Sequence, residues 1–292
     1  MKNFKFDVDY VRDQFPALSR SVNGTPAAFF DGPGGSQVPR RVVAAIEDYL
    51  FYHNANAGGE FLTSKDNDRL FRRGREVLAD FLNCAPEEVC FGANTTSNNI
   101  RLAFGFLRTL KAGDEIIITD IDHEGNRSPW RTLADFGIVV KSVSLDPETC
   151  TLNFDDYKAK LSDKTKLVCV NWAANACGTI TDVKAYIELA HKYGAVTVVD
   201  AVHYAAHKPI DVKAIDTDIL LCSAYKYFGP HVGVMYIRKE LGESFPSVRV
   251  YAEDNADMPT KMETGTLCGQ YLRRRSGRRV YCRPGREVRR VL

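Results

Sequence analysis

The sequence has 292 residues, which is enough for one large α/β domain or two smaller ones. Hydrophobic residues make up 45% and charged residues 26%, a balance typical of a soluble globular protein. No apolar segment approaches the ~20 residues needed to span a bilayer, and the first seven residues lack the apolar core of a signal peptide. We therefore expect a cytoplasmic protein with no membrane partner.

The net charge of +2 conceals two oppositely charged regions. Residues 267–292 contain nine arginines and one acidic residue, Glu287, and so carry a net charge of +8. Residues 1–266 carry 30 basic and 36 acidic side chains, which makes the main body mildly acidic at −6. A basic run can form a nucleic-acid or membrane arm. Because this one has no aromatic interleaving or known binding motif, we expect no nucleic-acid partner.

The eight cysteines do not predict a metal site. None of them forms a Cys-x-x-Cys pair, so neither a zinc site nor a thioredoxin-like motif is visible. Cys90, Cys169 and Cys222 lie inside apolar runs, where a reduced thiol acts as a small hydrophobic side chain.

The N-terminal part predicts helices over residues 8–18, 39–52 and 66–82, with a short strand at 27–31. The glycine-rich loop at 32–36 follows that strand. It matches neither a phosphate loop nor a dinucleotide fingerprint, so nucleotide binding is not favoured.

From residue 87 onward, short apolar runs alternate with helical patterns. Seven strands are predicted, at residues 88–91, 115–119, 138–143, 166–171, 195–200, 219–221 and 233–238. The helix after the first strand is expected to point these residues inward: Ile100, Ala103, Phe104, Leu107 and Leu110. Alternation of this kind predicts an α/β fold with a mostly parallel seven-stranded sheet covered by helices on both faces.

Lys226 lies just beyond the predicted strand at 219–221, with Ser223 three residues before it. Ligand crevices of α/β sheets open at the carboxyl ends of the strands. An amine held there can lose solvation and become a nucleophile, although a solvated loop lysine is the more ordinary explanation of a single lysine.

Other polar groups also follow strand ends, and each has an ordinary explanation. Thr95 and Thr96 can cap a helix or, with its free N–H groups, bind an anion. His123 can be a loop residue, or it can stack on a planar cofactor and transfer protons. Asp200 can cap a helix or pair with a cationic ring nitrogen. A lysine, an acid and an anion site at one sheet edge form the set that pyridoxal 5'-phosphate requires.

At these residues the sequence resembles the class V aminotransferase group of fold-type I pyridoxal-phosphate enzymes, and most closely its cysteine desulfurase-like members. The resemblance covers residues 11–266. The matching motifs occur in family order: Phe29–Asp31 with Pro39, Thr95-Thr96, Asp122–Asn126 with Pro129-Trp130, Asn171–Gly178, Val199–His203, Ser223–Pro230 and Met262–Thr266.

The resemblance implies roles for the matched residues. Lys226 would form a Schiff base with the cofactor and then move protons as a catalytic residue. Asp200 would pair with the pyridinium nitrogen, and His123 would stack on the ring and assist proton transfer. Asn175 would lie near the ring hydroxyl and the substrate.

The phosphate of the cofactor would be held by Thr95, Thr96 and Ser223, and Thr266 would reach the phosphate of a partner subunit. Two positions depart from the family pattern: His203 replaces a glutamine of the best-known desulfurases, and Tyr225 replaces a histidine. Both side chains can still donate hydrogen bonds to the cofactor.

The implied activity is cleavage of the C–S bond of L-cysteine or a related amino acid, giving alanine and sulfur. A homodimer and a sulfur-acceptor protein are the implied partners. Another class V activity (aminotransferase, epimerase, selenocysteine lyase or kynureninase-like) is the alternative, and an inactive truncated remnant is a third interpretation.

The expected domains are an N-terminal segment of the small domain at 1–20, a cofactor-binding large domain at 21–266 and an aberrant, disordered arginine-rich tail at 267–292. Family members continue after the Glu-x-Gly-Thr motif into a small C-terminal domain that carries a substrate-binding arginine. Composition changes abruptly at that point here. We therefore expect that most of the small domain is missing, through a change of reading frame after about Thr266.

Overall fold

The computed structural model describes residues 6–248, 258–267 and 269. Contacts divide the chain into two compact units. The first comprises Met1–Phe30, Gln37–Gly74 and Gly269–Leu292, and the second comprises Asp31–Ser36 and Arg75–Cys268. The expected tail at 267–292 lies outside the described residues, apart from Leu267 and Gly269.

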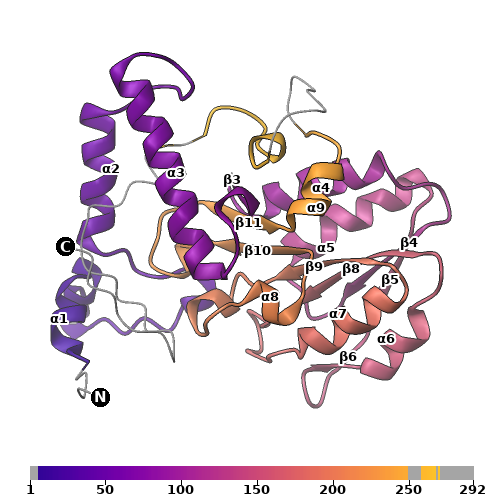
Figure 1. The fold of residues 1–292 in the computed structure, drawn as a ribbon. Helices are drawn as coiled ribbons and strands as arrows, with labels where there is room; N and C mark the ends of the chain where they lie inside the picture. Colours follow the sequence, from indigo (N-terminus) through magenta and orange to yellow (C-terminus); the bar gives the residue numbers. More distant parts are fainter. Residues whose placement is uncertain (1–5, 249–257, 268, 270–292) are drawn as a thin grey trace, which may run out of the picture. The chain divides into compact units, whose positions relative to one another are not determined.

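The second unit is built on one seven-stranded sheet, in the order β3-β11-β10-β9-β8-β4-β5 (Figure 1). Its strands are β3 (Val89–Gly92), β4 (Glu115–Thr119), β5 (Val139–Val143), β8 (Thr165–Asn171), β9 (Val196–Asp200), β10 (Ile219–Ser223) and β11 (Gly233–Ile237). Strands β5, β4, β8, β9 and β10 pair in parallel, whereas β11 is antiparallel to both of its neighbours. This confirms the predicted mostly parallel sheet.

Helices cover both faces of this sheet. Helices α4 and α5 pack against each other on one side, and α7 lies against β8 and β9 on the other (Figure 1). The helices of the chain are α1 (Val8–Asp13), α2 (Arg40–Tyr52), α3 (Leu62–Leu82), α4 (Thr95–Leu107), α5 (Glu124–Arg131), α6 (Phe154–Lys160), α7 (Val183–Lys192), α8 (Val212–Ile215) and α9 (Lys239–Ser244). No described helix is long and apolar enough to cross a lipid bilayer.

Shorter elements connect these parts. Single 3-10 turns are η1 (Pro16–Ser19), η2 (Gly32–Gly34), η3 (Pro86–Glu88), η4 (Thr132–Phe136), η5 (Tyr204–Ala206), η6 (Ala224–Lys226) and η7 (Thr260–Met262). Two-residue strands form two hairpins, β1 (Ser21–Val22) with β2 (Thr25–Pro26), and β6 (Leu145–Asp146) with β7 (Thr151–Leu152).

The core of the second unit lies between the sheet and its helices. The central strands are buried on both faces, which explains their continuous apolar sequences. Trp130 of α5 is fully buried and meets Phe106 of α4 edge to face, with ring centroids 5.9 Å apart. Phe245 adds a second such contact with Phe106 at 4.8 Å.

The first unit contains α1, α2 and most of α3. His53 at the end of α2 bonds the carboxylate of Asp66 through Nδ1 at 2.8 Å. The amide of Asn67 donates to the carbonyls of His53 and Ala55 at 3.0 and 2.9 Å. These bonds fix the irregular loop between α2 and α3.

Two sequence-based predictions are wrong. Residues 27–31 form no strand, because no described strand pairs with this segment. Phe30 in this segment is 93% exposed. In α4, Ile100 and Phe104 point outward with 43% and 63% exposure. The helix instead buries Leu102, Ala103 and Phe106 on the sheet.

Candidate active site

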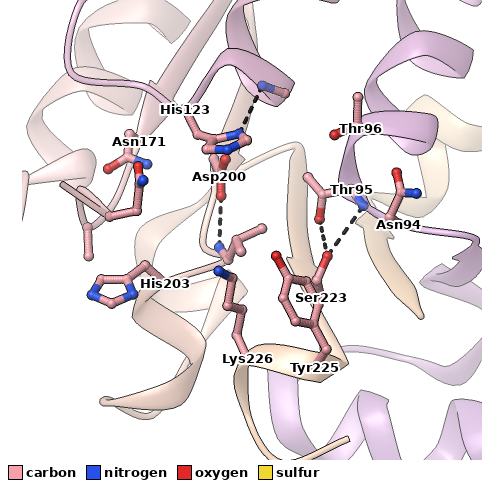
Figure 2. A pocket seen from close by; sticks show the side chains of 14 residues that line it. Asn94, Thr95, Thr96, His123, Asn171, Asp200, His203, Ser223, Tyr225 and Lys226 are labelled. Carbon is pink, nitrogen blue, oxygen red and sulfur yellow. Dashed lines mark hydrogen bonds between the residues drawn. The ribbon is translucent and has the colours of Figure 1, made fainter. Parts of the chain in front are cut away.

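A small pocket of about 80 Å³, partly open to solvent, lies at the carboxyl edge of the sheet (Figure 2). Its walls come from the segments that follow β3, β4, β8, β9 and β10, as expected for parallel strands. The lining residues are Asn94, Thr95, Thr96, His123, Gly125, Asn171, Ala173, Asn175, Asp200, Val202, His203, Ser223, Tyr225 and Lys226.

One end of the pocket is formed by the N-terminus of α4. Asn94 is the N-cap, and its side chain accepts a hydrogen bond from the Ser97 N–H at 2.8 Å. Thr95 lies against Ser223, with the two hydroxyl oxygens 2.7 Å apart. A helix N-terminus surrounded by hydroxyl groups attracts an anion such as a phosphate.

Strand β11 passes very close to this helix start. A Cβ atom on Gly233 would lie 2.5 Å from the backbone carbon of Asn94. Glycine is therefore required at this point of the strand, since any side chain would displace the helix N-terminus.

His123 lies above Asp200 in Figure 2 and is the N-cap of α5. Its Nδ1 accepts a hydrogen bond from the Gly125 N–H at 3.0 Å, so the neutral ring carries its proton on Nε2. A Cβ on Gly125 would come within 2.6 Å of the Thr96 hydroxyl. Glycine at 125 therefore leaves room for His123 and Thr96 on the same wall.

Asp200 is a buried carboxylate at the end of β9. Burial raises the pKa of Asp200 to about 6, although the Val202 N–H and the nearby His123 and Lys226 favour the charged form. The Val202 N–H donates to its Oδ1 at 2.8 Å. Burial, together with the charge of Asp200, also raises the pKa of the neighbouring Asp122 to about 8. The pocket floor thus favours a cation beside Asp200.

Lys226 is 8% exposed and lies in the turn that follows β10. Its Nζ donates to the carbonyl of Pro33 and lies 4.7 Å from the ring centroid of Tyr225. The loop that contains Pro33 is itself held to this turn. The N–H and hydroxyl of Ser36 both donate to the Tyr225 carbonyl, at 2.9 and 2.8 Å. Lys226 is therefore positioned both by its own turn and by the loop at 32–36, which is distant in sequence.

The remaining wall carries nitrogen and oxygen groups from the end of β8 and from the loop after β9. The pKa of His203 is lowered by burial and by the nearby His207 and Lys226, so the neutral ring is favoured. Asn171 is buried, and its side-chain oxygen has no hydrogen-bond partner among the described residues. A buried oxygen in this state is suited to a ligand that donates a hydrogen bond.

The structure brings together all but one of the site residues predicted from the sequence. Thr266 is exposed in the second unit and does not line the pocket. The others, whose individual roles stay predictions, are Thr95, Thr96, His123, Asn175, Asp200, His203, Ser223, Tyr225 and Lys226.

Sequence reasoning missed Asn94, Asn171 and Pro33. The sequence analysis offers Thr95 and Thr96 as caps of the helix, whereas the N-cap in the structure is Asn94. Asparagine immediately before a helix is a recognisable capping signal. Asn171 ends a predicted strand, and its position could have identified it. No local pattern could have placed the Pro33 carbonyl at Lys226, because the contact spans 193 residues.

Comparison with known proteins gives a family for this pocket. The family model for aminotransferase class-V matches residues 28–277. The chain belongs to this family. Members of the family are dependent on pyridoxal phosphate, and a match over most of the chain includes all the lining residues of the pocket.

The similar proteins include cysteine desulfurases and an aminotransferase-like protein. A cysteine desulfurase of Synechococcus elongatus is 38% identical over 81% of this chain, and the aminotransferase-like protein FGM3 of Gibberella zeae is 31% identical over 90%. The structure of a cysteine desulfurase from Thermococcus onnurineus NA1 matches with a TM-score of 0.83 at 28% identity, over 92% of this chain and 69% of that one. The chain spans 38% and 65% of the two curated relatives' lengths.

The residues present fit the cofactor of the family. The α4 N-terminus with Thr95 and Ser223 matches a phosphate, and the buried Asp200 matches a cationic ring nitrogen. The unpaired oxygen of Asn171 and the amine of Lys226 supply two further polar groups in the same pocket.

Proposed function

We propose that the chain is a pyridoxal-phosphate-dependent enzyme of the cysteine desulfurase type, which acts on L-cysteine and yields alanine and sulfur. The convergence of Lys226, Asp200 and the α4 N-terminus in one pocket carries this proposal. The desulfurase relatives described above support the choice of reaction.

The residues of the chain would hold the cofactor at three points. Thr95, Thr96 and Ser223 would bind its phosphate at the helix N-terminus. Asp200 would remain ionised beside the ring nitrogen, since the charge of that nitrogen offsets the burial of the carboxylate. Lys226 would attach the cofactor covalently through its amine.

When bound, pyridoxal phosphate supplies an electron sink for negative charge at the substrate Cα. Lys226 would accept the Cα proton through its amine, which lies in the same pocket. His123 would cover one face of the ring and offer the proton on Nε2 to the departing group. Asn175 and His203 would orient the ring from the opposite wall.

Three further assignments belong to this proposal. A homodimer would place Thr266 against the phosphate in a partner subunit, which agrees with its exposed position outside the pocket. A sulfur-acceptor protein would receive the sulfur. The domain limits at residues 20 and 266 would separate the small domain from the cofactor-binding domain.

An aminotransferase activity is a second candidate. The similarity to the aminotransferase-like protein of Gibberella zeae favours it. Incubation with L-cysteine in the presence of dithiothreitol, which reduces the released sulfur to sulfide, separates the two. Sulfide and alanine in equal amounts support desulfuration, whereas conversion of a 2-oxo acid to its amino acid without sulfide supports amino transfer.

Cofactor attachment can be tested by comparing Lys226→Ala with Lys208→Ala, a change of an exposed lysine outside the pocket. Titration with pyridoxal phosphate should give the visible absorption band of a lysine-bound cofactor in the wild type and in the control. After borohydride reduction, a modified Lys226 peptide is expected in both. Wild-type protein that stays colourless, or a label on another lysine, would contradict the proposal and favour a remnant without activity.

A further inference from the structure

A chain of buried polar side chains adjoins His123 but does not line the pocket. It consists of Thr119 at the end of β4, Asp122 in the turn that follows, Asn126 in α5 and Asn99 in α4. These side chains are between 0% and 7% exposed. Because burial of a polar group is unfavourable unless it is hydrogen-bonded, the bonds within this chain determine how the segment folds.

Hydrogen bonds join the four side chains in order. The Thr119 hydroxyl donates to Asp122 Oδ2, and Asn126 Nδ2 donates to Asp122 Oδ1 at 2.8 Å. Asn99 Nδ2 donates to Asn126 Oδ1 at 3.0 Å and also to the Gly125 carbonyl at 2.9 Å. Asn126 therefore bonds its own turn through its amide nitrogen and the neighbouring helix through its amide oxygen.

The same segment determines where His123 lies. The His123 carbonyl accepts the Asn126 N–H at 2.8 Å, and His123 Nδ1 accepts the Gly125 N–H at 3.0 Å (Figure 2). The residue is exposed, and the bond from Gly125 is the one hydrogen bond that holds its ring among the described residues. The orientation of the ring therefore depends on Gly125, whose own carbonyl is bonded to Asn99.

These bonds also connect two walls of the pocket. Asn99 lies in α4 one turn after Thr95 and Thr96, which line the pocket end expected to bind a phosphate. His123 and Gly125 at the start of α5 form the neighbouring wall. The two walls approach closely, since a Cβ atom on Gly125 would lie 2.6 Å from the Thr96 hydroxyl. The bonds of Asn99 thus set the spacing between the α4 N-terminus and the ring of His123.

We propose that Asn126 is a positioning residue: through its hydrogen bonds to Asp122 and Asn99 it fixes the ring of His123 relative to the α4 N-terminus. The consequence for cofactor binding rests on the proposed function, in which His123 covers one face of the cofactor ring. The placement of the His123 ring can be measured without cofactor, so the two proposals can fail separately.

Asp122 supports Asn126 through hydrogen bonds more than through charge. Burial and the neighbouring Asp200 raise the pKa of Asp122 to about 8, although hydrogen bonds from Thr119 and Asn126 and the charge of Arg127 favour the ionised form. The carboxyl group is therefore largely protonated at neutral pH. Asparagine at this position has nearly the same shape, no charge and the same acceptor oxygen, which makes Asp122→Asn the conservative variant.

Nitrogen NMR of the histidine-labelled, cofactor-free chain at about pH 8, where histidine is neutral, measures the placement of the ring. The signals of His123 are those missing from His123→Ala. Asn126→Ala should move and broaden the Nδ1 resonance of His123, because the Gly125 N–H no longer stays in place. Asp122→Asn should keep the wild-type signal. An unchanged Nδ1 resonance in Asn126→Ala would overturn the proposal, whether or not the chain binds pyridoxal phosphate.

Titration with pyridoxal phosphate separates positioning from a general loss of stability. Asn126→Ala should weaken binding by roughly five- to tenfold, the factor that one buried hydrogen bond contributes. In the His123→Ala background the same change should weaken binding by less than about twofold, because no ring remains to be positioned. The control is Leu102→Ala, a fully buried side chain of α4 outside the pocket, which should keep the wild-type affinity within about twofold.

Asn99→Ala removes the same link from the α4 side and serves as a second variant if Asn126→Ala does not fold. It should change the NMR signal and the affinity in the same direction. Equal losses of affinity with and without His123, or an Asp122→Asn variant as impaired as Asn126→Ala, would overturn the proposal. A wild-type chain that binds no pyridoxal phosphate would contradict the proposed function, and the NMR comparison would still decide the role of Asn126.

Discussion

Burial of the Asp200 carboxylate lowers the folding stability of the cofactor-free protein. The carboxylate is 4% exposed, and burial is the first cause of its raised pKa. A carboxylate whose pKa is raised on folding destabilises the folded state once the pH exceeds its pKa in the unfolded chain. The cost should therefore appear as the pH rises from about 4 to about 6 and remain above that range.

We expect Asp200→Asn to stabilise the cofactor-free protein by about 2 to 3 kcal/mol above pH 7, from a pKa shift of roughly two units. The amide oxygen can still accept the hydrogen bond from the Val202 N–H. The difference between the two proteins should vanish below about pH 4, where Asp200 is protonated in both states. Urea unfolding at several pH values measures it.

Asp155→Asn provides the control, because Asp155 is an exposed carboxylate with its side chain 89% accessible. Its effect should stay within about 0.5 kcal/mol at every pH. Asp200→Asn should also bind pyridoxal phosphate more weakly, because the ring nitrogen loses its anion. A variant that is less stable than the wild type at neutral pH would refute the assigned cost.

For single residues, the sequence was informative where a polar side chain lies at or just after the end of a predicted strand. Lys226, Asp200 and His123 could be predicted because parallel strands bring their carboxyl ends to one edge. Groups that enter from the side could not be predicted. The Pro33 carbonyl and the hydroxyl of Ser36 reach the lysine turn through contacts 193 and 189 residues apart, and nothing in their own neighbourhood marks them.

Among the elements, α4 links folding to ligand binding through its first turn. Asn94 caps it at the pocket, and Asn153 caps α6 elsewhere, each by accepting a hydrogen bond from an N–H three residues later, at 2.8 and 2.9 Å. The two caps are therefore a matched pair.

Either substitution, Asn94→Ala or Asn153→Ala, should lower the free energy of unfolding by about 1 kcal/mol. Only Asn94→Ala should weaken pyridoxal-phosphate binding, by roughly fivefold if about 1 kcal/mol of helix-end geometry is lost. Equilibrium titration followed by absorbance measures the affinities. Equal affinities in the two variants would show that the geometry of the α4 N-terminus does not contribute to binding of the phosphate.

The strand positions could be predicted closely, because buried strands have continuous apolar sequences. Their direction could not. The run at 233–237 is apolar at every position and reads the same whether the strand runs parallel or antiparallel, yet β11 is antiparallel to β10 and β3. The outward face of α4 was missed for a related reason, since Phe104 is apolar but 63% exposed.

For the molecule as a whole, the stability of the second unit depends on the middle of its sheet. Leu221 of β10 is fully buried and lies in register with Asp200 and Met235 on the neighbouring strands. Leu221→Ala should lower the free energy of unfolding by about 2 to 5 kcal/mol through lost burial and an unfilled cavity.

The control is Val139→Ala, on edge strand β5, where the side chain is 43% exposed. This change should cost less than about 1 kcal/mol. Thermal and urea unfolding measure both variants. A cost at Leu221 no larger than that at Val139 would contradict the placement of the core.

Fold class and family could be inferred from the order of motifs along the chain. The division into two units could not, because Asp31–Ser36 belongs to the second unit while the segments on either side of it belong to the first. The assignment of this short segment to the second unit depends on contacts between residues that are distant in sequence, and these contacts cannot be predicted from local composition.

The place of β11 has a consequence for biosynthesis. Strand β3 is the first of the sheet to be synthesised, but its neighbour in the sheet is β11, the last. The contact between Thr95 and Ser223 likewise joins residues 128 positions apart. A growing chain on the ribosome therefore holds the N-terminus of α4 without Ser223 through much of translation. The pocket becomes complete only after β11 has been synthesised, so the cofactor binding proposed above would follow, and could not guide, the folding of the earlier strands.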